Sequence, residues 1–194
     1  MTASAPVTRE HPGFGTKAAV WLAFALLVVI VFGAAFIRFA QGDATLDGPA
    51  EAARWVYRVA AIAFVLVTAG VAVLGWEMLG PGAHAVLAAQ IVLAVALTFL
   101  GRVTPSSDHP LVAFGNPLGG LALVGLGWWL VLAVSRRSVR RSMPLAGVVL
   151  AVIAFGAIAA VVLWRPGLGA GLAAQLAATV ALVAGVTLAY PRNA

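Results

Sequence analysis

The sequence predicts an all-α fold: a polytopic membrane helix bundle with six transmembrane helices. Of its 194 residues, 63% are hydrophobic and only 9% are charged, and the mean hydropathy is +1.06. Charged residues make up roughly a quarter of an ordinary soluble domain. A soluble core of this size could not bury so much apolar side chain, so lipid must cover the remainder.

The apolar residues gather into six segments, each near the ~20 residues that a bilayer-spanning helix needs. We place these helices at residues 18–37, 56–75, 83–101, 116–134, 145–164 and 168–190. The first is too long for a signal-peptide core and no convincing cleavage site follows it, so we expect a retained helix. Four regions result: a cytoplasmic tail (1–17), a four-helix bundle (18–135), a basic cytoplasmic loop (136–144) and a C-terminal hairpin with its tail (145–194).

Basic residues indicate the orientation. The net charge is +6, but the cations stand at the ends of apolar runs, which favours membrane topology over nucleic-acid binding. With the N-terminus inside, seven basic residues are cytoplasmic and five are outside, and four of the seven lie in "SRRSVRRS". We therefore expect both termini in the cytoplasm. The membrane is expected to be the inner membrane of a bacterium. An interfacial aromatic belt is predicted from four residues near helix ends: Trp55, Trp76, Trp164 and Tyr190.

Connections between the helices differ in length. "GWEMLGPG" and "WRPGLG" predict tight hairpins, because proline and glycine break helices. The longer loops, at 38–55 and 102–115, fall on the outer side. Loops of this length carry function more often than short ones do.

A faint repeat links two of the hairpins. "PGAHAVLAAQIVLAVAL" (81–97) and "PGLGAGLAAQLAATVAL" (166–182) align without a gap and place Gln90 and Gln175 at matching positions. If a duplication produced them, the second and third helices should pack as the fifth and sixth do. Each glutamine is interpreted as an interhelical hydrogen-bonding group, with a ligand or proton-path role as the alternative.

Few residues suggest catalysis. The chain has no cysteine, which excludes disulfides, thiolate catalysis and Cys-based metal sites. His11 lies in a polar tail, while His84 and His109 are predicted on opposite membrane faces and could not share one ion. Phosphate-binding and nucleophile-elbow motifs are absent.

Arginines gather at the outer ends of the first three helices: Arg38, Arg54, Arg58 and Arg102. Guanidinium groups grip carboxylates and phosphates, so this cluster could hold the propionates of a haem or another anionic group. Alternatively, Arg38 and Arg54 snorkel to lipid phosphates or pair with acidic residues of the adjoining loop.

Four stretches together resemble one family: "VVIVFGAAFIRFAQGDATL", "ARWVYRVAAIAFVLVTAGVAVL", "LAAQIVLAVALTFLGRVTP" and "HPLVAFGNPLGGLALVGLGWWLVLA". Their order is similar to the helices of haem A synthases. The resemblance covers residues 21–135 and implies one four-helix half of that family's eight-helix bundle, here followed by a hairpin.

The resemblance implies a b-type haem and a set of cofactor-binding residues: Tyr57, Arg58, Asn116, Arg38 and Arg102. Family members ligate iron through histidines at the positions of Tyr57 and Asn116, and they carry glutamate at the position of Arg54. Arg58 matches the family, and a tyrosine phenolate can bind ferric haem. Asparagine is a poor iron ligand.

Asn116 has two interpretations. Asparagine followed by proline favours a helix start, in which Asn116 caps free N–H groups and Pro117 occupies the first turn. The nearby glycines would then let a helix or a flat ring approach closely; they are Gly115, Gly119, Gly120, Gly125 and Gly127. In the second interpretation, Asn116 marks an altered haem pocket.

The resemblance implies a non-catalytic or altered relative of haem A synthase that acts in cytochrome oxidase biogenesis or haem handling. The alternative is a structural subunit that packs against a respiratory or transport membrane complex. Haem A synthase activity itself would need iron ligands that the sequence does not show, and a quinone could use the same outer pocket. Expected partners are the lipid bilayer and a terminal oxidase or another respiratory complex; whether copies of the chain associate stays open.

Overall fold

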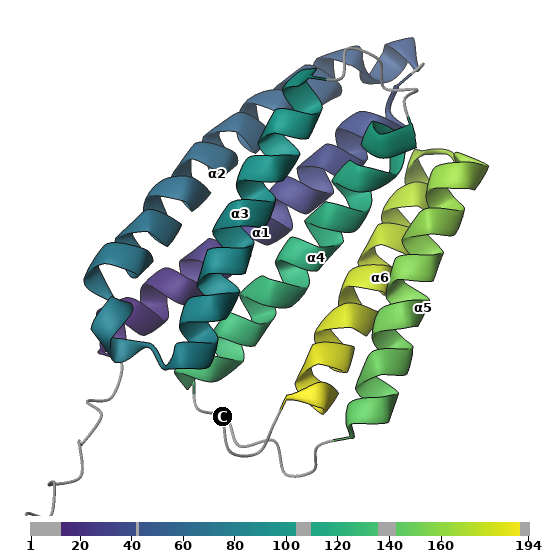
Figure 1. The fold of residues 1–194 in the computed structure, drawn as a ribbon. Coiled ribbons are helices and arrows are strands. Elements are labelled where there is room, and N and C mark those ends of the chain that lie inside the picture. Colours follow the sequence, from purple (N-terminus) through teal and green to yellow (C-terminus); the bar gives the residue numbers. More distant parts are fainter. Residues whose placement is uncertain (1–12, 42, 104–109, 136–142, 191–194) are drawn as a thin grey trace, which may run out of the picture.

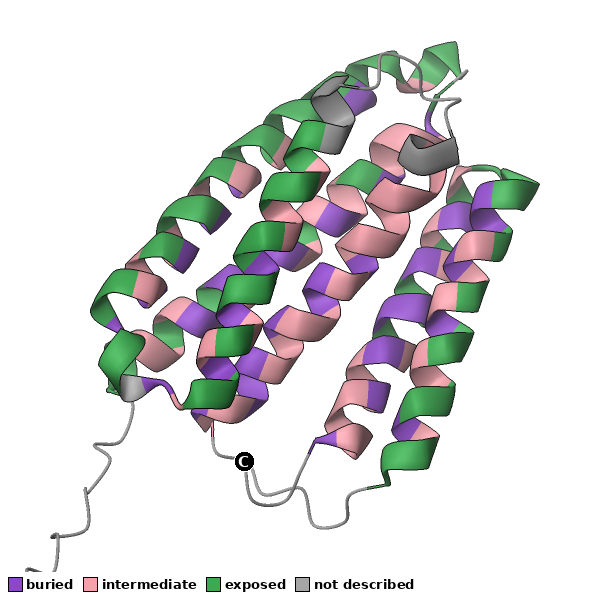
Figure 2. Cartoon of the chain, viewed as in Figure 1, coloured by how far each residue is buried: buried purple, intermediate pink, exposed green. Residues whose placement is uncertain are grey.

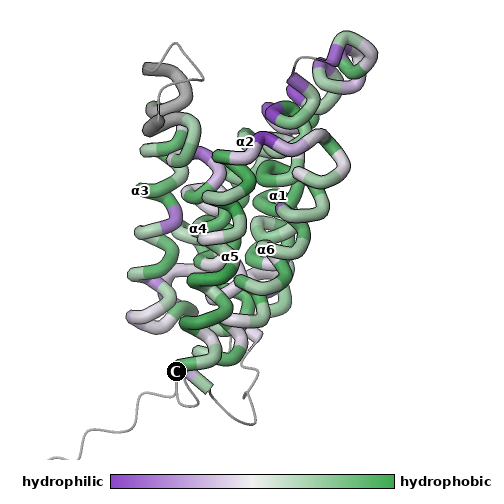
Figure 3. Tube along the Cα trace, turned by 90° about the vertical axis from the view of Figure 1, so that its right-hand side faces the viewer, coloured by the Kyte–Doolittle hydropathy of each residue, from purple (hydrophilic) through white to green (hydrophobic). Residues whose placement is uncertain are grey.

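The chain is a bundle of long helices. The computed structural model describes residues 13–41, 43–103, 110–135 and 143–190. Over these ranges it has no strand, and six helices are long and apolar enough to cross a membrane, which confirms the predicted fold class. They are α1 (Phe14–Phe39), α2 (Asp47–Leu74), α3 (Pro81–Val103), α4 (Pro110–Ser135), α5 (Pro144–Trp164) and α6 (Leu168–Ala189) (Figure 1). Figure 3 shows hydrophobic residues along these helices and a group of hydrophilic residues where α2 begins.

Helix α4 occupies the centre of the bundle. It packs against α1 and α3 on one side and against the α5–α6 hairpin on the other, while α2 packs along α1. Half of the α4 span is buried, compared with 17–28% of the other five spans. Figure 2 shows the same contrast, since α2 and α3 are exposed along their outward faces. The central position of α4 brings its small residues close to several neighbouring helices.

Glycines of α4 accept side chains from three neighbouring helices. A Cβ atom added at any of four glycines would lie 2.6–3.3 Å from a leucine or valine carbon. The contacting residues are Leu97 at Gly119, Val31 at Gly120, Leu182 at Gly125 and Leu27 at Gly127. The prediction that these glycines allow close approach is confirmed, and the approaching groups are aliphatic side chains of the chain itself.

Helix α2 begins at Asp47, well before the predicted start at residue 56. Its charged first turns are helical because a helix can continue beyond the lipid, and Arg54 pairs there with Glu51 at 3.0 Å. The predicted 38–55 loop is therefore much shorter. It contains a 3₁₀ turn at Ala44–Leu46, where hydrogen bonds from Thr45 lower the pKa of the Asp43 carboxyl.

Helix α4 begins at Pro110, so the prediction that Asn116 starts and caps this helix is wrong. Asn116 and Pro117 instead lie inside the helix, more than one turn after its first residue. The physical reason is that the earlier Pro110 suits a first helical turn equally well. Pro117 then interrupts an established helix rather than opening one.

The two hairpins of the sequence repeat pack differently, which contradicts the expectation of equivalent packing. Helices α5 and α6 pack along their length, whereas α2 and α3 contact each other only weakly. At the α5–α6 crossing the backbones meet: a Cβ atom on Gly147 would lie 2.5 Å from the carbonyl oxygen of Gly185. Glycine at both positions allows this approach.

Three members of the predicted aromatic belt are exposed and one is not. Trp55, Trp76 and Trp164 lie at the surface, but Tyr190 is only 5% exposed. Its ring packs against Trp129, 5.4 Å between centroids, and burial raises the pKa of its phenol. Tyr190 therefore closes the end of the bundle.

Candidate functional site

Arg38 lies in the last turn of α1, and its guanidinium reaches α4. Its Nη1 donates a hydrogen bond to the carbonyl oxygen of Ala113 at 2.8 Å. In a regular helix this carbonyl would accept from the N–H of residue 117, but Pro117 has none. Arg38 thus satisfies the acceptor that the proline leaves free. This contact is neither of the two alternatives considered for Arg38, lipid phosphates or a loop carboxylate.

Tyr57 and Asn116 are both half-buried and are held by different helices. Tyr57 packs against α1, where a Cβ atom on Gly33 would lie 3.7 Å from the Cβ atom of Tyr57. Asn116 lies on α4, which makes no contact of note with α2. The two positions that the resemblance assigns to iron ligands are therefore on helices that do not pack together.

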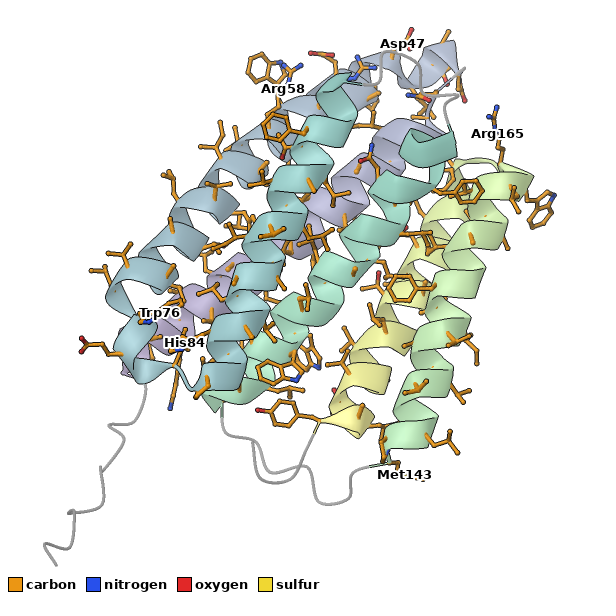
Figure 4. The ribbon with its side chains drawn as sticks, viewed as in Figure 1. Asp47, Arg58, Trp76, His84, Met143 and Arg165 are labelled. Carbon is orange, nitrogen blue, oxygen red and sulfur yellow. The ribbon has the colours of Figure 1, made fainter. Side chains whose placement is uncertain are left out.

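Arg54 and Arg58 have other partners than Arg38. Arg54 is exposed and forms an ion pair with Glu51, which agrees with the alternative that Arg54 pairs with an acidic residue. Arg58 is also exposed, with its guanidinium carbon 5.3 Å from the centroid of the Trp55 ring (Figure 4). Arg102 lies near the end of α3, and its side chain is outside the described part of the chain.

The interior between α2 and α4 is filled by apolar side chains. Leu27, Phe64 and Leu123 are buried there in one cluster, and further aliphatic residues of α1 and α3 pack against it, among them Leu97. A porphyrin against α4 at Gly119, one turn from Asn116, would have to displace Leu97, which packs there. In this packing the residues present do not fit a haem.

One threonine and one glutamine each have a buried polar atom that makes no hydrogen bond to the described residues. Thr68 Oγ1 and Gln175 Nε2 are buried without a hydrogen-bond partner among the described residues. Thr68 lines a cavity of ≈ 10 Å³ together with the buried Gln90. That volume suits one water molecule, which could bond to both side chains. The repeat pattern identifies the glutamines, whereas Thr68, a polar residue within a predicted span, is expected to bond the backbone of its own helix and does not.

His84 stabilises the turn between α2 and α3. Its ring stacks on Trp76 with 3.9 Å between centroids, and its Nε2 lies 2.6 Å from the carbonyl oxygen of Trp76 (Figure 4). His11 and His109 lie outside the described residues. Within the part of the chain that the structure describes, no three His, Cys, Asp or Glu side chains are placed to hold a metal ion.

Comparisons with known proteins identify no relative of this chain. No family model, curated protein or solved structure matches the chain. The resemblance to haem A synthases, and the haem that it implies, therefore stay predictions. Six helices of the described residues are long and apolar enough to cross a membrane, which implies an integral membrane protein in contact with the lipid bilayer.

Proposed function

We propose that this chain is a non-catalytic structural protein of a bacterial inner membrane that packs against a respiratory complex. The observation that carries the proposal is the filling of the bundle by its own side chains. Each of the four α4 glycines described above holds an aliphatic side chain of a neighbouring helix, which leaves them no room for a flat ligand. A protein built in this way acts through its outer surface.

The polar groups support the same function. The guanidinium of Arg38 donates to the carbonyl oxygen of Ala113 and so serves helix packing. The buried glutamines Gln90 and Gln175 carry no charge, although Gln175 Nε2 has no hydrogen-bond partner among the described residues.

The partner class comes from the sequence resemblance, which implies cytochrome oxidase biogenesis. We propose a terminal oxidase or another respiratory complex as the partner, with both termini of the chain in the cytoplasm. Even numbers of spans place both termini on one side, and the beginning of α1 and the end of α6 lie at the same end of the bundle (Figure 1).

Co-purification tests the partner. The tagged chain, expressed from its own locus and extracted in a mild detergent, should carry oxidase subunits in stoichiometric amount. Purification of the chain alone, together with normal oxidase assembly in a deletion strain, would overturn the proposal.

An absorption spectrum tests the filled interior. The purified chain, produced with ample haem, should show no visible band either oxidised or dithionite-reduced. A Soret band that shifts on reduction and changes in Tyr57→Phe would contradict the proposal and would favour haem handling with Tyr57 near the iron.

A further inference from the structure

An apolar groove runs along the outer surface between α1 and α2. Its volume is ≈ 420 Å³, and all its lining residues are apolar. Leu26 and Val29 of α1 form one wall, Val56 and Val59 of α2 form the other, and the small Ala60 and Ala63 lie between the larger side chains. The groove exists because these alanines leave space between two helices that otherwise pack closely.

A guanidinium group lies beside one of the residues that line this groove. Trp55 lines the groove at the end where α2 begins, and the guanidinium of Arg58 lies against the Trp55 ring. Arg58 makes no ion pair with any described residue, whereas the neighbouring Arg54 is neutralised by Glu51. Among the described residues, the apolar groove thus has a guanidinium without an ion pair beside Trp55, the lining residue nearest the start of α2.

This combination matches one class of ligand. A glycerophospholipid has an apolar acyl chain and a phosphate at one end, and arginine binds phosphate through two parallel hydrogen bonds. Tryptophan favours the membrane interface, where the headgroups lie. A transmembrane helix of a partner protein would fill the groove but would leave the charge of Arg58 without a counterion at the edge of the lipid.

We propose that the groove between α1 and α2 binds one acyl chain of an anionic glycerophospholipid, whose phosphate is held by Arg58 beside Trp55. The site is independent of the proposed packing against a respiratory complex, since it needs only lipid. An anionic headgroup is preferred over a zwitterionic one because basic residues near the membrane surface attract net negative charge.

Native mass spectrometry of the detergent-purified chain tests the headgroup contact. Titrated with phosphatidylglycerol, the wild-type chain should retain one lipid more tightly than with phosphatidylcholine. Arg58→Gln should weaken phosphatidylglycerol binding about fivefold. Arg54→Gln is the matched control and should leave it unchanged, because Glu51 already occupies that guanidinium. Equal binding by Arg58→Gln and wild type, or equal binding of both lipids, would overturn the proposal.

A photo-crosslinker tests the occupant in the native membrane. Val59 lines the groove and is 63% exposed, so a benzoyl-phenylalanine there should tolerate folding and meet the occupant directly. The expected product is the chain plus the mass of one phospholipid. A crosslink to a second copy of the chain or to another protein would overturn the lipid assignment.

Discussion

The hairpins α2–α3 and α5–α6 share a sequence pattern and pack in opposite ways. Helices α5 and α6 meet backbone to backbone at Gly147 and Gly185 and form a closed pair. Helix α2 instead follows α1, and α3 follows α4, so their hairpin is open beyond its turn. The comparison teaches that the matching glutamines do not set the packing of a hairpin; the position of small residues does.

The largest expected effect comes from filling the α5–α6 crossing. Gly147→Leu should destabilise the protein by more than about 3 kcal/mol, because the new side chain meets the backbone of α6. Gly156→Leu is the control on the same helix, since nothing lies within 4 Å of a Cβ atom there. The Tm of both variants is measured by thermal unfolding in detergent. An equal Tm would contradict the conclusion that the small residue at position 147 determines the packing of α5 against α6.

Replacing the buried polar side chains Gln175 and Thr68 by apolar ones should change the stability of the bundle in opposite directions. Gln175→Leu removes a buried donor without a partner and should stabilise the bundle by about 1 kcal/mol. Thr68→Val should destabilise it by about 0.6 kcal/mol, because a water bound in the cavity that Thr68 borders would lose one hydrogen-bond partner. The free energy of unfolding in mixed micelles distinguishes them. Stabilisation by both substitutions would mean that the cavity holds no water.

The smallest effect concerns the α2–α3 turn. His84→Phe keeps a ring against Trp76 but removes the hydrogen bond to the Trp76 carbonyl. The amide of Leu79, which donates to the same carbonyl, should then exchange with solvent about twofold faster. The amide of Arg165, in the α5–α6 turn, serves as the internal reference and should not change. An unchanged rate at Leu79 would show that stacking alone closes the turn.

Sequence reasoning predicted the membrane class and all six helices, because apolar composition and segment length determine them directly. The predicted start of α2 is too late, because charged residues such as Asp47, Glu51 and Arg54 are typical of loops but here extend the helix. The predicted helix start at Asn116 is wrong because Pro110 suits a first turn as well as Pro117 does, and because the carbonyl that Pro117 leaves free is satisfied by Arg38, 75 positions away from Ala113. Local patterns do not reveal that kind of pairing.

The most direct test of the account is a double-mutant cycle on Arg38 and Pro117, since the central claim is that Arg38 serves packing rather than a ligand. Arg38→Met should cost about 1–3 kcal/mol in the wild-type background, because the Ala113 carbonyl loses its donor. In Pro117→Ala the new N–H of residue 117 bonds that carbonyl, so the cost should fall by about 1 kcal/mol or more. An equal cost of Arg38→Met in both backgrounds would contradict the account and return Arg38 to the candidates for binding an anionic group.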